Sequence, residues 1–182
     1  EIHQKKIIDL IENYKIGGLM FLQGGPVRQA HLTNLYQKKS KIPLMIAIDA
    51  EWGVSMRLDS SFRFPWQMTL GAIDDTNLIY KMGVEVARQC KLLGIHINFA
   101  PVVDVNSNPE NPIINNRSFG EDHLKVSQMS LAYMRGMQDN NILSCAKHFP
   151  GHGDTDLDSH KTLPTVNQLK YKLEQVELFP YR

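Results

Sequence analysis

The sequence has little cysteine and lacks the spacings that would give cysteine a special role. Among its 182 residues only Cys90 and Cys145 are cysteines, and they show neither a disulfide framework nor the spacing of a metal-binding motif. Cys90 lies in a predicted helix and Cys145 in a predicted strand, where cysteine commonly packs as a small apolar residue. The two cysteines therefore do not identify a compartment.

An excess of charge of one sign and long apolar runs are also lacking. The formal net charge is +1, so the chain lacks the excess of positive charge with which proteins bind nucleic acid or an anionic membrane. No apolar stretch approaches the roughly 20 residues of a membrane-spanning helix, and no signal peptide is present. Because Glu1 already lies inside a helical pattern, an N-terminal segment missing from this sequence remains an open alternative.

Helical and strand patterns alternate along the chain. Apolar residues recur with helical spacing in five segments: 7–14, 27–39, 76–93, 126–137 and 166–178. Short, continuous apolar runs predict four strands: 19–22, 44–49, 96–101 and 142–146. Such alternation is typical of parallel strands covered by helices, so the chain is either a doubly wound sheet or a (β/α)8 barrel.

Polar residues at the strand ends favour the barrel. Asp49, the loop 104–117 and the pair Lys147-His148 follow three successive predicted strands. Groups from successive strands converge at a barrel mouth, and no glycine-rich phosphate turn follows the first strand. A barrel needs about eight strands and typically about 250 residues. We therefore predict an α/β fold, a partial TIM-type (β/α)8 barrel, in which residues 1–182 are one incomplete domain holding about the first half to two-thirds of the barrel.

The densest group of titratable side chains is KHFPGHGDTDLDSH, residues 147–160, directly after the last predicted strand. A carboxylate beside a histidine fixes the imidazole tautomer and raises its basicity, so the stretch predicts chemistry. One alternative is that these groups only satisfy backbone donors in a long turn. Another is a zinc or iron site, whose ligands would come from His148, His152, Asp154, Asp158 and His160.

Four stretches of the chain together resemble a known family. They are IAIDAEWGVSMR, FPWQMTLGA, APVVDVNSNPENPIINNRSFGED and KHFPGHGDTDLDSH, in this order. They resemble the N-terminal barrel of the β-N-acetylglucosaminidases of glycoside hydrolase family three, over nearly the whole chain from the second strand to the last helix. The resemblance implies a retaining exo-enzyme that removes terminal β-linked N-acetylglucosamine, with no metal or other cofactor.

The resemblance also implies the catalytic groups. It assigns His160 as the acid/base and Asp158 as its orienting partner, on a mobile loop, in place of the second carboxyl group of most retaining glycosidases. An imidazole with a pKa of about 6.5 can donate and accept a proton near neutral pH. The alternative is that Asp158 or Ser159 caps the last helix. The family nucleophile is an aspartate on a later strand, beyond residue 182, so we expect the 182 residues alone to be inactive.

Sugar binding maps onto five further side chains by the same resemblance: Asp49, Arg57, Arg117, Lys147 and His148. Lys147 has support of its own, because a lysine that closes an apolar strand would otherwise be partly buried and unpaired. Asp104 and Asn106 lie in an Asn-Pro-rich loop, where such residues usually hold turns, and we expect them to be scaffold. Gly151 and Gly153 would allow the catalytic loop to bend.

The segment DAEWG departs from many relatives, because Trp52 replaces a small residue. Trp52 either stacks on a sugar face or packs under the loop, and we favour packing.

Three other functions remain open for this chain. Some relatives transfer the sugar to phosphate, and a histidine acid/base would not repel that anion as a carboxylate would. A sugar-binding barrel without turnover and a metal-dependent hydrolase are the others. The expected partner is a glycan or muropeptide substrate from bacterial cell-wall recycling, without nucleic acid and without a membrane span in this segment. This implies the bacterial cytoplasm, with the periplasm or secretion as alternatives.

Overall fold

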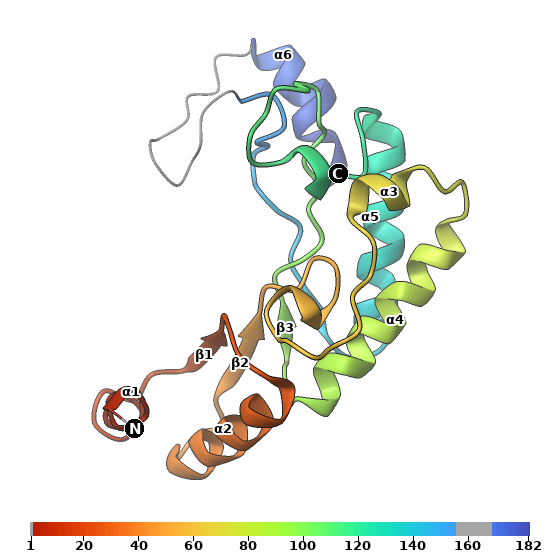
Figure 1. Cartoon of the computed structure of the whole chain (residues 1–182). Coiled ribbons are helices and arrows are strands. Elements are labelled where there is room, and N and C mark those ends of the chain that lie inside the picture. The colour runs from red at the N-terminus through yellow and green to blue at the C-terminus, as the bar shows by residue number, and fades with distance from the viewer. Residues whose placement is uncertain (1, 156–168) are drawn as a thin grey trace.

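Four short strands form one parallel sheet in the computed structural model, which describes residues 2–155 and 169–182. The strands are β1 (Gly18–Phe21), β2 (Met45–Ile48), β3 (Ile97–Asn98) and β4 (Leu143–Ser144), and their order in the sheet is their order in the chain (Figure 1). A doubly wound sheet reverses its strand order at a switch point, whereas barrel strands simply follow one another. The chain is therefore a partial (β/α)8 barrel, as predicted.

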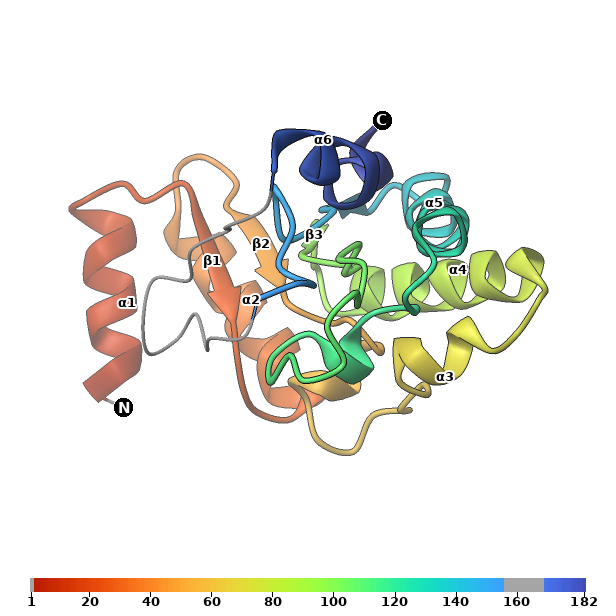
Figure 2. The same ribbon diagram turned by 90° about the horizontal axis from the view of Figure 1, so that it is seen from above.

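One helix precedes the first strand, and further helices connect the successive strands of the sheet. They are α1 (Ile2–Glu12), α2 (Pro26–Lys39), α4 (Thr76–Leu92) and α5 (His123–Gln138). Seen from above, β1, β2 and β3 lie between α1 and α4 (Figure 2). Aspartates cap α4 and α5: Asp75 accepts the amide of Asn77 at 2.9 Å, and Asp122 accepts that of Leu124 at 2.9 Å. No helix in the described part of the chain is long and apolar enough to cross a bilayer.

The described helices pack on one face of the sheet, and the other face is exposed at its two edge strands. Met20, Ala47, Ile97 and Leu143 are partners in register across the four strands, so they share one face. On this face Met20 is 42% and Leu143 54% exposed, whereas Ile48 on the opposite face is fully buried in the core. In a closed barrel the first face points inward and is packed in layers of side chains.

The strands are shorter than predicted. The run 96–101 forms a strand only at Ile97–Asn98, and Pro101 has no amide hydrogen to continue the ladder. The short helix α3 (Gln67–Gly71) lies in a motif to which the sequence pattern assigned no element.

The predicted helix 166–178 is interrupted in its described part. It consists of α6 (Lys170–Lys172), a π-helical turn (Leu173–Glu177) and a 3-10 turn (Phe179–Tyr181), and residues 166–168 lie outside the described residues. The 3-10 turn contacts α5.

Helices α4 and α5 touch at two glycines. A Cβ atom added to Gly136 would overlap the Tyr80 carbonyl oxygen, and one added to Gly83 would overlap that of Tyr133. We expect Gly136→Ala to lower the free energy of unfolding by about 1–3 kcal/mol, because forcing atoms into a packed contact moves the backbones apart. Urea denaturation measures this, with Gly17→Ala as the control, since nothing lies within 4 Å of that position. An unchanged midpoint for Gly136→Ala would contradict the close packing of these helices.

Candidate active site

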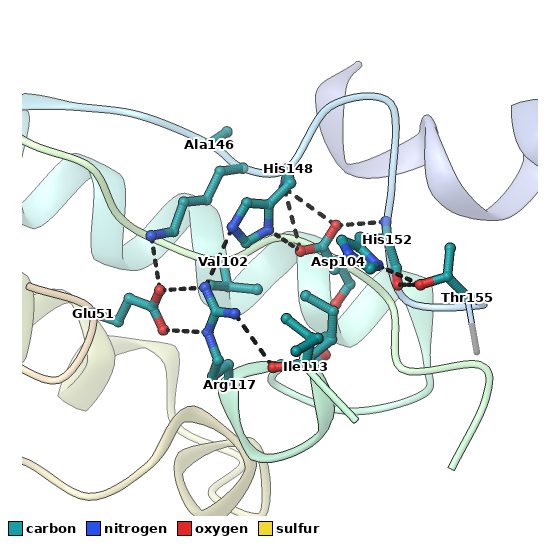
Figure 3. A network of polar contacts seen from close by, with 12 residues as sticks. Glu51, Val102, Asp104, Ile113, Arg117, Ala146, His148, His152 and Thr155 are labelled. Atoms are coloured by element: carbon teal, nitrogen blue, oxygen red, sulfur yellow. Dashed lines mark hydrogen bonds and ion pairs between the residues drawn. The ribbon is translucent and has the colours of Figure 1, made fainter. Parts of the chain in front are cut away.

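Charged side chains from three strand ends meet in one network at the carboxyl edge of the sheet (Figure 3). Asp49 and Glu51 follow β2, Asp104 follows β3, and Lys147 and His148 follow β4. Carboxyl ends of parallel strands meet on one side of a barrel, which is where barrel enzymes place their sites.

Lys147 joins the two carboxylates that follow β2. Its Nζ lies 2.6 Å from Asp49 Oδ1 and 2.7 Å from Glu51 Oε1. Arg57 holds the other side of Asp49, with Nη2 2.5 Å from Oδ2 and Nε donating to the Asp49 carbonyl oxygen at 3.0 Å. Burial raises the pKa of Asp49, but Lys147 and Arg57 together outweigh it and hold the pKa below its usual value. Asp49 is therefore ionised at neutral pH.

Glu51 forms a two-point ion pair with Arg117. Arg117 Nη2 lies 2.7 Å from Oε1 and Nε lies 3.0 Å from Oε2, the parallel arrangement that suits guanidinium and carboxylate. Burial lowers the pKa of Arg117, but Glu51 more than compensates and the pKa is raised. Glu51 was not among the predicted site residues, because its partners Arg117 and Lys147 lie far away in the chain and no local pattern reveals the contacts.

Asp104 holds the segment after β4 and orients His148, so its scaffold role reaches beyond a turn in its own loop. It accepts hydrogen bonds from His148 Nδ1 at 2.6 Å and from the amide of His152 at 2.8 Å. Arg117 Nη2 lies 3.3 Å from His148 Nε2. Because arginine only donates, this contact makes Nε2 the acceptor, and Nδ1 is the atom that faces Asp104.

The loop after β3 also fixes the backbone that follows His148. The Asn111 side chain donates to the carbonyl oxygen of His152 at 2.7 Å, and the Thr155 hydroxyl contacts His152 Nδ1. Asn106 takes part through its backbone, which donates to Gly120 at 2.9 Å. The segment carrying His148 is thus held by many bonds before any ligand binds.

Gly151 and Gly153 have a packing role. A Cβ atom at Gly151 would overlap Glu177, and one at Gly153 would overlap the carbonyl oxygen of Val105. Gly151 also has φ +140°, a conformation that side chains rarely allow. These glycines were predicted to allow bending, and in the structure the close approach of neighbouring chain requires them.

The structure brings all five predicted sugar-binding side chains together and leaves each partly accessible. Their side-chain exposures run from 13% for Lys147 to 36% for His148, whereas those of Glu51 and Asp104 are 0%. The five accessible groups offer a carboxylate acceptor, ammonium and guanidinium donors and an imidazole, which is what binding of sugar hydroxyls requires. Glu51 and Asp104 lie behind them and set their positions.

Trp52 packs against another aromatic residue, in agreement with the packing role favoured from the sequence. Its ring centroid lies 4.1 Å from that of Trp66, and the Arg63 guanidinium lies 5.9 Å from the Trp52 ring. The favourable stacking of cation and aromatic ring stabilises this loop.

Asp158 and His160 lie outside the described residues, so their predicted roles remain predictions. In the ranges 2–155 and 169–182 no three His, Cys, Asp or Glu side chains are grouped as metal ligands.

Comparison with known proteins gives the family. The model of the glycosyl hydrolase family 3 N-terminal domain matches residues 2–182. Beta-hexosaminidase A of Pseudoalteromonas piscicida is 39% identical over 189 residues, which cover 97% of this chain and 32% of that protein. The chain thus belongs to glycoside hydrolase family 3, and it represents the N-terminal domain of that family.

Solved structures agree with this assignment. A family 3 beta-N-acetylglucosaminidase from Paenibacillus sp. str. FPU-7 superposes with a TM-score of 0.90 at 36% identity, covering 96% of this chain and 35% of that one. A beta-glucoside phosphorylase, BglX, superposes with a TM-score of 0.90 at 30% identity, covering 96% of this chain and 32% of that one. The chain therefore spans about a third of the length of these relatives.

Proposed function

We propose that this chain is part of a retaining exo-β-N-acetylglucosaminidase that hydrolyses terminal β-linked N-acetylglucosamine. The observation that carries the proposal is the convergence of Asp49, Lys147 and His148, partly exposed and held by Glu51 and Asp104, in a chain of this family. Asp49, Arg57, Arg117, Lys147 and His148 would bind the terminal sugar. The names of the beta-hexosaminidase and beta-N-acetylglucosaminidase relatives support this substrate class.

We also propose that residues 1–182 are one incomplete domain, inactive alone. The exposed sheet face and the edge of β1, which no described strand pairs, are features that a closed barrel covers. A hollow of about 850 Å³ lies beside β1, lined by residues of β1 and α2 and by Ile7 of α1. Further strands would fill this space and carry the aspartate nucleophile.

The proposed mechanism has two steps, as in other retaining glycosidases. The nucleophile attacks the anomeric carbon while His160, oriented by Asp158, protonates the leaving oxygen, so the glycosidic bond breaks as the covalent glycosyl-enzyme bond forms. The same histidine then removes a proton from water, which attacks the anomeric carbon and releases both sugar and nucleophile. The substrate would be a muropeptide or related glycan, used in the bacterial cytoplasm during cell-wall recycling.

A phosphorylase is the second candidate. The similarity to the beta-glucoside phosphorylase favours it, because that protein shares the fold at 30% identity. Phosphate would replace water in the second step, and a neutral imidazole would tolerate the anion better than a carboxylate.

Product analysis separates the two candidates. The complete protein is incubated with a chromogenic β-N-acetylglucosaminide, with and without inorganic phosphate. The proposal predicts free N-acetylglucosamine in both cases, at a rate that phosphate does not raise. Sugar phosphate as the main product would establish the phosphorylase, and no cleavage by the complete protein would contradict both.

Removing the charge of Asp49 should weaken substrate recognition. We expect Asp49→Asn to lower kcat/KM by about 10- to 100-fold, because hydrogen bonds to charged groups contribute about 1.5–3 kcal/mol. Initial rates at low substrate concentration measure the effect. Asp74→Asn is the control, because Asp74 is 90% exposed and pairs with Lys125 on the surface. Equal rates for the two variants would show that Asp49 does not bind the substrate.

A further inference from the structure

Glu177 is a buried carboxyl group that none of the roles above uses. It ends the π-helical turn Leu173–Glu177, and it is 1% exposed. Neither of its carboxyl oxygens has a hydrogen-bond partner of ordinary geometry among residues 2–155 and 169–182, although the Gly153 backbone and the Ser107 side chain approach the carboxyl group. Burying an ionised carboxylate without partners is strongly unfavourable, so this environment favours the uncharged acid.

The side chain of Glu177 packs on the backbone that leads away from His148. It fills the space beside Gly151, where a Cβ atom would overlap it. Asp104 holds the next residue of the same backbone by accepting the amide of His152 at 2.8 Å. The segment Gly151–Thr155 is thus held by two carboxyl groups from different parts of the chain.

Further carboxyl groups surround Glu177. Burial, followed by the charges of Asp154 and Asp104, raises the pKa of Glu177 to about 8, although the Gly153 backbone and the Ser107 side chain oppose the rise. Asp154 Oδ1 is also buried, and no described residue forms a hydrogen bond with it. Neighbouring carboxyl groups in a site of low polarity do not all ionise together, so one of them keeps its proton.

The other titratable groups near Glu177 do not reverse this. Tyr181 belongs to the last turn, and burial followed by nearby negative charges raises its pKa. Lys172 lines a recess together with Asp154, and His152 lies on the facing backbone. None of the described residues donates a hydrogen bond of ordinary geometry to the Glu177 carboxyl oxygens.

We propose that Glu177 is a positioning residue that, as an uncharged carboxylic acid, holds Gly151–Thr155 and thereby the His148–Asp104 pair in place. When Glu177 ionises, a new negative charge appears beside Asp154 and Asp104, and repulsion displaces the segment. The effect on activity rests on the proposed function, whereas the effect on folding does not.

The kinetic test compares Glu177→Gln and Glu177→Ala in the complete protein. Glutamine is uncharged at every pH, so Glu177→Gln should keep kcat at pH 7 within about 3-fold and move the alkaline loss of activity upward by about one pH unit or more. Alanine leaves a cavity, so Glu177→Ala should lose activity at least about tenfold at all pH values. Glu174→Gln is the control, since Glu174 lies on the same turn with 43% of its side chain exposed. An alkaline limb unchanged in Glu177→Gln, or Glu177→Gln as inactive as Glu177→Ala, would overturn the proposal.

The folding test needs no activity. In the unfolded chain the pKa of a glutamate is about 4.3. In the folded protein the pKa of Glu177 is raised to about 8. The folded state therefore binds more protons in this window, and the free energy of unfolding falls as pH rises through it. Between about pH 5 and pH 8, the urea midpoint of Glu177→Gln should therefore fall less than that of the unmodified protein. Equal pH dependence of the two midpoints would overturn the proposal even if the enzyme proved inactive on every substrate.

Discussion

Replacing His160 by alanine is expected to lower kcat by about 10²- to 10⁴-fold, the usual contribution of a general acid/base. The proposed mechanism needs His160 first to protonate the leaving oxygen and then to activate water. The loss should depend on the leaving group. A glycoside whose leaving phenol is strongly acidic needs no proton, so its bond cleavage should be much less affected than that of an alkyl glycoside or a natural disaccharide.

Pre-steady-state and steady-state rates with both kinds of substrate measure this difference. His31→Ala is the matched control, because His31 is an exposed residue of α2 and is not part of the charged network at the strand ends. A loss of the same size for acidic and for poor leaving groups would show that His160 positions the substrate rather than transferring a proton. Unchanged rates would exclude it from the mechanism.

Replacing Glu51 by alanine is expected to lower the free energy of unfolding by about 3–5 kcal/mol. Glu51 pairs with both Arg117 and Lys147 and has no exposure of its own. Without Glu51, the positive charges of Arg117 and Lys147 face each other in a partly buried site. Removing one partner of a buried ion pair is strongly destabilising because the remaining charge is no longer compensated. The same change should lower kcat/KM, because Arg117 and Lys147 lose the group that positions them.

Urea denaturation of the complete protein measures the loss. Glu85→Ala is the control, since Glu85 pairs with Arg88 on the surface of α4 and such pairs contribute about 0–1 kcal/mol. Equal shifts of the midpoint for the two variants would show that the network around Glu51 does not stabilise the fold.

Apolar periodicity was sufficient to predict the order and type of the main elements. The runs around Ile46 and Ile142 are continuous because helices bury them, and α4 and α5 carry clear apolar faces. The bounds of the strands were predicted less accurately, because the apolar runs extend beyond the residues that form the hydrogen-bonded ladder. The helix α3 is too short to show a period, and the interrupted turns after Lys170 share their apolar spacing with a regular helix.

The sequence singled out the partly exposed side chains of this network and not the buried ones. Asp49, Lys147 and His148 stand out because they end apolar strands. Asp104 and Glu51 act on partners 44 and 66 residues away in the chain, so no local pattern reveals their contacts. Buried orienting groups of this kind become visible only when the fold brings distant segments together.

A structure of the complete protein with N-acetylglucosamine bound tests the central claim most directly. The claim is that the edge formed by Asp49, Lys147 and His148 binds the terminal sugar. It predicts sugar hydroxyls within hydrogen-bond distance, about 2.7–3.2 Å, of these three side chains, with Glu51 and Asp104 unmoved behind them. A sugar bound elsewhere, with the Asp49–Lys147 pair out of its reach, would contradict the claim.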